Sequence, residues 1–251
     1  MPAGTGFFIF MMSLAPDILF HIGPFPVTNT ILGMLLVDAI VLSGIYFIYK
    51  NISLVPGKMQ ALFEVVMEEF YKLTASTATI HTRTIFEYVM SFFIFILVAN
   101  FSDLIPGVTA FGFYHGQTFT PLIRSTATDL NATLALALIS QTAAHSLSIK
   151  TLGIKKYLNK FFSAKPLELY SGLLELVSEF TKIIAFSFRL FGNMFVDALM
   201  LGLLSASFAF LAPIPLVLYE YFVAIIQAII FALLTMAFMA IMTTSHNPME
   251  E

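Results

Sequence analysis

The sequence predicts an all-α polytopic membrane protein with about five membrane spans and one amphipathic surface helix. Hydrophobic residues make up 59% of the 251 positions and charged residues only 11%, whereas soluble domains carry roughly 25% charged residues. Several apolar runs approach the roughly 20 residues that cross a bilayer as a helix. These runs are unbroken and lack the two-residue alternation of a membrane β-barrel, so helices must satisfy their backbone groups within the lipid.

The first three spans are separated by a segment of mixed character and by a loop. A first span covers 30–49 and a second covers 84–102, and a third follows at about 129–149. Residues 55–75 begin with Val-Pro-Gly and then mix acidic and basic residues with apolar ones. This mixture is typical of an amphipathic helix that lies on the membrane surface. The Gly-, Thr- and Pro-rich stretch 106–127 reads as a loop.

The last two apolar segments, 167–204 and 213–243, are longer than a membrane requires. At 1.5 Å per residue they would form helices of about 57 Å and about 46 Å. The hydrocarbon core of a bilayer is only about 30 Å thick. We therefore expect an overlong, strongly tilted helical hairpin over 167–243.

The basic residues indicate how the single membrane domain, 1–251, is oriented. They gather in two loops, one with Lys50, Lys58, Lys72 and Arg83, the other with Lys150, Lys155, Lys156, Lys160 and Lys165. The loop between them contains only Arg124. The positive-inside rule places both basic loops in the cytoplasm. The N-terminal segment 1–29 is then external and the C-terminus internal.

A stripe of polar residues crosses the fourth predicted span. Its members recur at intervals close to whole helical turns: Glu175, Glu179, Lys182, Arg189, Asn193 and Asp197. On the fifth span Glu220 and Gln227 also share a face. Charges inside a membrane mark ion or proton pathways. Arginine keeps its proton, so it acts as a fixed charge and not as a relay. The stripe therefore suggests two conduits separated by a cationic barrier.

Simpler interpretations exist for several of the polar residues in the apolar segments. Arg189 could pair with Asp197 two turns away and hold helices together. Gln227 could be an ordinary hydrogen bond between helices, and His145, near a span end, is expected to be structural or interfacial. Side chains near the cytoplasmic end could extend to the interface, as long polar side chains often do: Glu175, Glu179 and Lys182.

The stripe and its surroundings resemble subunit a of F-type ATP synthases. FRLFGN (188–193) places Arg189 on the arginine of that family's motif. LLELVSEFTK (173–182) resembles the segment before it, with three residues on its polar positions: Glu175, Ser178 and Lys182. AIIQAIIFALLTMAF (224–238) resembles the last helix, with Gln227 on its glutamine. Weaker matches lie at 55–66, 100–107 and 129–138.

The sequence departs from the family pattern at two positions. Many bacterial members carry Glu nine residues after the arginine, where this chain has Ala198, and the acid is the neighbouring Asp197. Because one residue turns a side chain by about 100° around a helix, Asp197 is not a full substitute. Many members also carry His seven residues before the glutamine, where this chain has Glu220. Glu220 is then the better candidate for the titrating group on the external side.

The resemblance implies a proton-conducting stator subunit of a rotary ATP synthase. Protons would reach the c-ring from outside past one group of residues, Asn193, Asp197, Glu220 and Gln227. They would leave to the cytoplasm past another, Glu175, Ser178, Glu179 and Lys182. Arg189 would separate the two half-channels and promote deprotonation of the ring carboxylate. The hairpin 167–243 would be the ion-translocating element.

The resemblance also implies the setting of the subunit. It makes no ATP itself, and neither a cofactor nor a metal site is expected. Its expected partners are the c-ring, the b subunits of the peripheral stalk, membrane lipid and the transported H⁺ or Na⁺, without nucleic acid. A bacterial inner membrane is the expected location, with an organellar membrane as the alternative.

Two other classes of function compete with this one. A secondary transporter could use Arg189 to bind an anionic substrate, but such folds show broken helices or inverted repeats, and the sequence has neither. A purely structural scaffold would tolerate replacement of Arg189.

Overall fold

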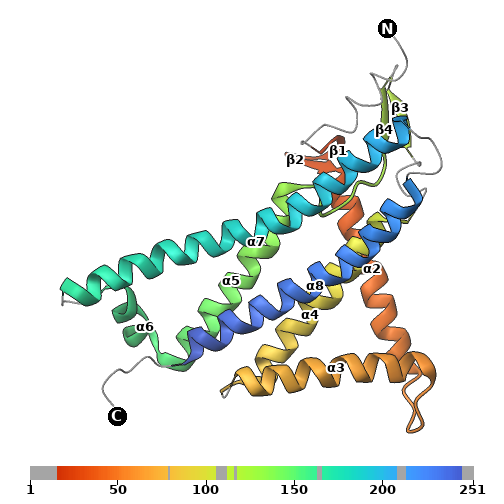
Figure 1. The fold of residues 1–251 in the computed structure, drawn as a ribbon. Helices are drawn as coiled ribbons and strands as arrows, with labels where there is room; N and C mark the ends of the chain where they lie inside the picture. The colour runs from red at the N-terminus through yellow and green to blue at the C-terminus, as the bar shows by residue number, and fades with distance from the viewer. Residues whose placement is uncertain are drawn as a thin grey trace. The chain divides into compact units, whose positions relative to one another are not determined.

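A computed structural model describes residues 16–78, 80–105, 112–115, 118–162, 166–207 and 213–244. Within these residues the chain is mostly helical, and five helices are long and apolar enough to cross a membrane. They are α2 (Asn29–Lys50), α4 (Thr82–Asp103), α5 (Leu130–Leu152), α7 (Pro166–Ser207) and α8 (Pro213–Thr243) (Figure 1). The all-α polytopic membrane fold is confirmed.

The helix boundaries follow from local sequence signals. The side-chain oxygen of Thr28 accepts a hydrogen bond from the backbone N–H of Ile31 at 3.4 Å and so caps the start of α2. Helix α3 (Lys58–Thr77) starts directly after Pro56 and Gly57. On α3 the ammonium group of Lys72 is paired with two exposed glutamates, Glu68 and Glu69, which precede it by four and three residues. The amphipathic helix predicted at 55–75 is thus present at nearly the same position.

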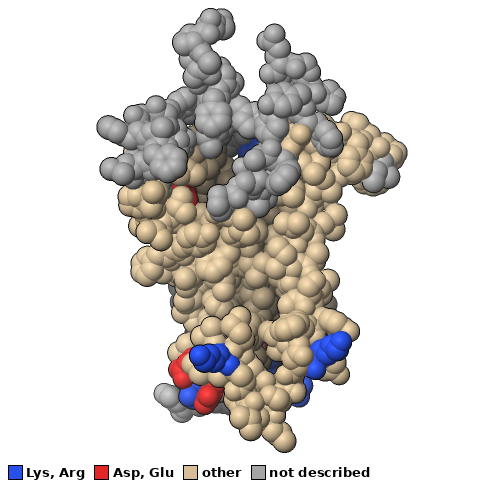
Figure 2. Space-filling view, turned by 90° about the vertical axis from the view of Figure 1, so that its right-hand side faces the viewer, with Lys and Arg blue, Asp and Glu red and all other residues tan. Residues whose placement is uncertain are grey.

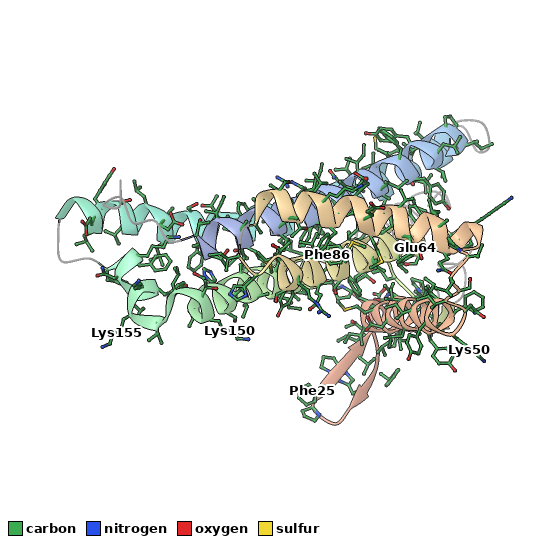
Figure 3. The ribbon with its side chains drawn as sticks, turned by 90° about the horizontal axis from the view of Figure 1, so that it is seen from below. Phe25, Lys50, Glu64, Phe86, Lys150 and Lys155 are labelled. Atoms are coloured by element: carbon green, nitrogen blue, oxygen red, sulfur yellow. The ribbon has the colours of Figure 1, made fainter. Side chains whose placement is uncertain are left out.

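Two short antiparallel hairpins occupy regions outside the predicted spans. Strands β1 (Ile18–Ile22) and β2 (Phe25–Thr28) pair in the second half of the N-terminal segment, and Figure 3 shows Phe25 at the tip of this hairpin. Strands β3 (Gly112–His115) and β4 (Thr118–Pro121) pair within the predicted loop 106–127. Residues 1–15 of the predicted external segment lie outside the described residues.

The second basic loop contains a short helix that the sequence did not predict, α6 (Ile154–Phe161). Gly153 precedes it with φ +79° and ψ 152°, a conformation essentially reserved for glycine. The chain can therefore turn sharply between α5 and α6. Lys150 on α5 and Lys155 on α6 extend outward from the helices in Figure 3.

Helices α7 and α8 are both continuous and both overlong. Helix α7 has 42 residues and α8 has 31, which correspond to about 63 Å and about 46 Å of helix. Most of the surface in view in Figure 2 is uncharged, with Lys, Arg, Asp and Glu confined to small areas. Such a surface suits contact with lipid.

Residue contacts divide the chain into two compact units. The first comprises Met1–Asn51, Ile94–Thr133 and Phe188–Ile229, and the second Ile52–Phe93, Leu134–Ser187 and Ile230–Glu251. The division passes through α7 just before Arg189. Each unit therefore contains its own part of the polar stripe.

Candidate functional site

In the first unit, the guanidinium of Arg189 has no charge partner among the described residues. The residue lies on α7 between Phe188, which is 57% exposed, and Leu190, which is 2% exposed. Its Nη1 atom is buried and has no hydrogen-bond partner there. The ion pair with Asp197 considered from the sequence does not form in this part of the chain, where every ion pair involves other residues. A cation is thus held at the helix without a counter-ion among the described residues.

One turn further along α7, a hydrogen bond joins the two long helices. The Nδ2 atom of Asn193 donates to the Oε1 atom of Gln227 on α8 at 3.0 Å. Gln227 is buried, and its Nε2 atom has no hydrogen-bond partner within the described residues. The amide of Gln227 therefore keeps an unused donor in an apolar environment.

The two acids of this unit are electrostatically coupled. Glu220 on α8 is 3% exposed and feels the charge of Asp197 on α7. One oxygen of each carboxylate, Oε1 and Oδ2 respectively, is buried without a partner in the described chain. This unit thus presents carboxyl oxygens on both α7 and α8 that can accept a hydrogen bond or a proton.

Buried apolar side chains hold α7 and α8 together in the first unit. Met194, Ala224 and Ala127 form a buried cluster against which Phe101 and Leu104 pack. Small residues such as Ala224 let membrane helices approach closely. The polar residues at neighbouring positions of α7 and α8 are consequently brought into reach of one another.

The structure adds polar residues that the sequence analysis did not assign. The Nδ2 atom of Asn100 on α4 donates to the carbonyl oxygen of Ala224 at 3.4 Å. The hydroxyl of Ser125 donates to the Oδ2 atom of Asp103, the last residue of α4, at 2.5 Å. A signal was available, because NFSDLIPG (100–107) sets three polar residues, Asn100, Ser102 and Asp103, at the end of an apolar span.

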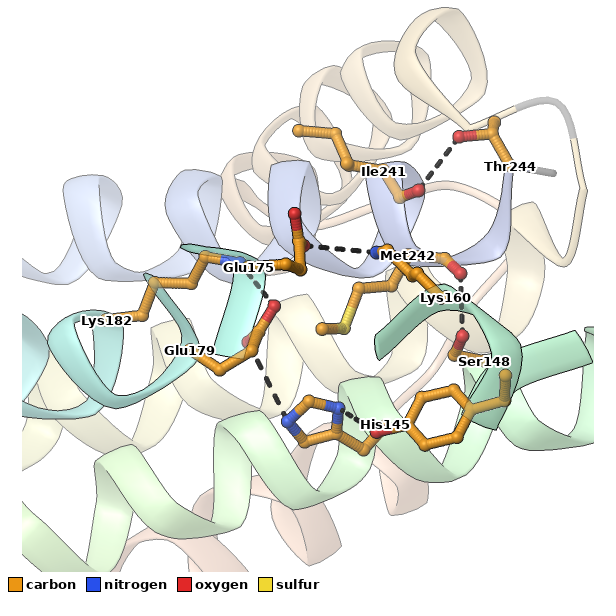
Figure 4. A network of polar contacts seen from close by, with 10 residues as sticks. His145, Ser148, Lys160, Glu175, Glu179, Lys182, Ile241, Met242 and Thr244 are labelled. Carbon is orange, nitrogen blue, oxygen red and sulfur yellow. Dashed lines mark hydrogen bonds and ion pairs between the residues drawn. The ribbon is translucent and has the colours of Figure 1, made fainter. Parts of the chain in front are cut away.

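In the second unit, Glu179 is the centre of a polar network (Figure 4). It is 5% exposed, and its Oε1 atom accepts a hydrogen bond from the ammonium of Lys182 at 2.7 Å. The same ammonium lies 4.7 Å from the ring centre of Phe238 on α8, a cation–π contact. The simpler interpretation, in which these side chains extend to water at the membrane interface, does not hold for Glu179 and Lys182, because both side chains are largely buried.

Two further predicted site residues, Glu175 and Ser178, lie on the same part of α7. The Oε1 atom of Glu175 is 3.1 Å from the ammonium of Lys160 on α6. The helices approach closely there, because a Cβ atom at Gly172 would collide with the backbone carbonyl of Phe161. Ser178 is exposed. In the described part of the chain no group of three or more His, Cys, Asp and Glu residues could hold a metal ion.

Comparison with known proteins gives one consistent result. The family described as "ATP synthase A chain" matches residues 27–240. The chain is 29% identical over 236 residues to "ATP synthase subunit a" of Moorella thermoacetica, covering 94% of this chain and 100% of that protein. It is 30% identical over 240 residues to "ATP synthase subunit a, sodium ion specific" of Propionigenium modestum, covering 95% and 80%. It is 31% identical over 225 residues to "ATP synthase subunit a 2" of Pelobacter propionicus, covering 88% and 90%.

Proposed function

Since the chain belongs to the ATP synthase A chain family, we propose that it is the non-catalytic, proton-conducting stator subunit of a rotary F-type ATP synthase. It offers two offset half-channels to a ring of c subunits, in a bacterial inner membrane, and is held by the b subunits of the peripheral stalk. Membership of the family and the five apolar helices support a multi-pass subunit of such a complex.

The observation that carries this proposal is the uncompensated cation at Arg189. A buried donor without a partner is costly, so a site of this kind is stabilised when a carboxylate arrives from outside the chain. A ring carboxylate that passes Arg189 is drawn into its ionised form and gives up its proton. The guanidinium itself keeps its protons and repels a proton that would cross directly.

The external half-channel is assigned to the polar residues of the first unit. Glu220 is the main titrating group, and Asp197 modulates it through its charge. The hydrogen bond between Asn193 and Gln227 orders the amides between these acids and Arg189. A proton that reaches the ring here neutralises a carboxylate, which can then face lipid without the large cost of a buried charge.

The cytoplasmic half-channel is assigned to the second unit. Glu179 and Glu175 accept the departing proton, while Lys182 holds Glu179 in place, and Ser178 lies at the exposed edge. Each proton that traverses both half-channels releases about 2.3 kcal/mol per 100 mV of membrane potential. The hairpin 167–243 is therefore the ion-translocating element of the single membrane domain.

The test replaces Arg189 by Ala in the assembled complex in inverted vesicles. ATP-driven proton pumping should fall to the background level, whereas ATP hydrolysis by the uncoupled enzyme should persist. The matched control is Arg83→Ala, since Arg83 is exposed and, within the described part of the chain, forms its ion pair with the exposed Glu87 at 3.1 Å. Pumping near the wild-type rate in Arg189→Ala would show that Arg189 has only a structural role and would refute its role as a barrier between the half-channels.

The transported ion is tested in the same vesicles. Pumping that does not require Na⁺ and is abolished by a protonophore identifies H⁺ as the ion. Pumping that requires Na⁺ and is resistant to a protonophore would replace the proton in this proposal by Na⁺, the ion in the name of one relative.

A further inference from the structure

The second unit contains a histidine and a tyrosine that continue the polar network beyond α7. The Nε2 atom of His145 on α5 lies 3.7 Å from the Oε2 atom of Glu179. Its other ring nitrogen, Nδ1, is 2.9 Å from the hydroxyl of Tyr157 on α6. Figure 4 shows a dashed line from each ring nitrogen of His145, one of them to Glu179. Three helices thus contribute one titratable group each to a continuous row.

The two ends of this row differ in their access to water. Glu179 is 5% exposed, and its Oε2 atom, the one facing His145, has no hydrogen-bond partner in the described chain. Side chains become more accessible beyond it, because about a quarter of the His145 side chain is exposed and Tyr157 directly follows the exposed Lys155 and Lys156 on α6. The row therefore leads from a buried carboxylate to a solvated surface.

We propose that His145 and Tyr157 form the final proton relay from Glu179 to the cytoplasm, an inference that rests on the function proposed above. Protonated Glu179 gives its proton to Nε2 of His145. The Nδ1–H of the same ring passes a proton to the phenol oxygen of Tyr157, which releases its own hydroxyl proton to water. Glu179 loses one proton, water gains one, and the imidazole is left in its other tautomer. It returns when Nε2 gives its proton to water and Nδ1 takes one from water, since part of the His145 side chain is exposed.

The surrounding charges suit this direction of transfer. Four groups act on His145: Tyr157 and Lys160 from α6, and Glu179 and Lys182 from α7. The two ammonium groups disfavour a positive charge on the imidazole and the Glu179 carboxylate favours one, and proton exchange at the two ring nitrogens leaves the ring neutral. Burial raises the pKa of Tyr157, so its hydroxyl acts only by exchanging one proton for another.

Local backbone features hold the row in place. Gly153 allows the turn that brings α6 back beside α5, and the Tyr157 ring packs edge-on against His145 and Phe161. Close approach at Gly172 and the ion pair of Lys160 with Glu175 fix α6 against α7. The gap of 3.7 Å at Glu179 is closed by a small rotation or by one bridging water.

The experiment measures passive proton conductance of the assembled membrane sector in inverted vesicles stripped of the catalytic head. Tyr157→Phe removes only the hydroxyl, and Tyr170→Phe, on an exposed side chain of α7, is its matched control. Loss of one hydrogen-bonded relay step should slow conductance about two- to tenfold in Tyr157→Phe and leave Tyr170→Phe unchanged. His145→Ala should be slower still, and imidazole added on the cytoplasmic side should restore it.

The pH profile distinguishes a relay from a structural contact. Wild-type conductance should depend on pH through the titration of the His145 imidazole, and His145→Gln should abolish that dependence. Slower conductance with an unchanged profile and no rescue by imidazole would overturn the relay, as would wild-type rates in both variants. If His145 variants fail to assemble, the rate in Tyr157→Phe decides alone. Failure of the proposed function would appear separately, as a wild-type complex that conducts no protons.

Discussion

The hydrogen bond between Asn193 and Gln227 makes a quantitative prediction about the external half-channel. The two amides meet across α7 and α8 at 3.0 Å, and the Nε2 atom of Gln227 already lacks a partner in the described chain. Asn193→Ala would leave the Oε1 atom of Gln227 unpaired as well. Gln227→Ala would remove the same bond from the other side.

The expected magnitude follows from the chemistry of the pair. Hydrogen bonds between membrane helices contribute about 0.6 kcal/mol on average and about 1.7 kcal/mol at most in double-mutant cycles. If the bond orders the pathway, the double variant should be less impaired than the product of the two single variants. The discrepancy should be about threefold to about twentyfold in the pumping rate.

The assay is the initial rate of ATP-driven proton pumping in inverted vesicles that carry equal amounts of assembled complex. The four members of the cycle are wild type, Asn193→Ala, Gln227→Ala and the double variant. Residues that do not interact give additive effects within about 0.3–0.5 kcal/mol. Additivity at that level would refute the view that this bond organises proton transfer.

Two further predictions address Glu220 and Gly172. Glu220→Leu should lower the pumping rate by about 100-fold or more, because a positioned proton-transfer group is lost. Glu220→His should retain pumping, because imidazole also takes up and releases a proton. Equal pumping rates of the two variants would contradict the titrating role. Gly172→Leu should destabilise the complex by about 1–3 kcal/mol, because the new side chain collides with the Phe161 carbonyl, as measured by thermal unfolding. Gly44→Leu is its control, since open space surrounds Gly44, and an equal loss of stability in both would show that the close approach at Gly172 is unimportant.

The sequence by itself was sufficient for the membrane architecture. Long apolar runs have a single low-energy solution in lipid, the helix, because no water is present to satisfy the backbone. The five spans and the surface helix therefore appear within a few residues of their predicted limits. The helical period also identifies which polar residues share a face, and so the stripe around Arg189 could be recognised before any coordinates.

Regions outside the spans were less predictable. The hairpins β1–β2 and β3–β4 and helix α6 are short, and short elements leave weak periodic signals. Helix α6 depends on the turn at Gly153, and hydropathy patterns do not predict the positive φ of this residue.

The pairing of side chains between helices was decided by tertiary structure alone. A helical face can be read from spacing, but the rotation and register of two packed helices depend on which side chains interlock, such as Met194 with Ala224 in the first unit. That packing brings Asn193 to Gln227. In the second unit, the packing of α5, α6 and α7 places His145 between Glu179 and Tyr157. In the sequence this histidine is isolated. Periodicity along one helix carries no information about a partner on another, and so the relay could be inferred only from the folded chain.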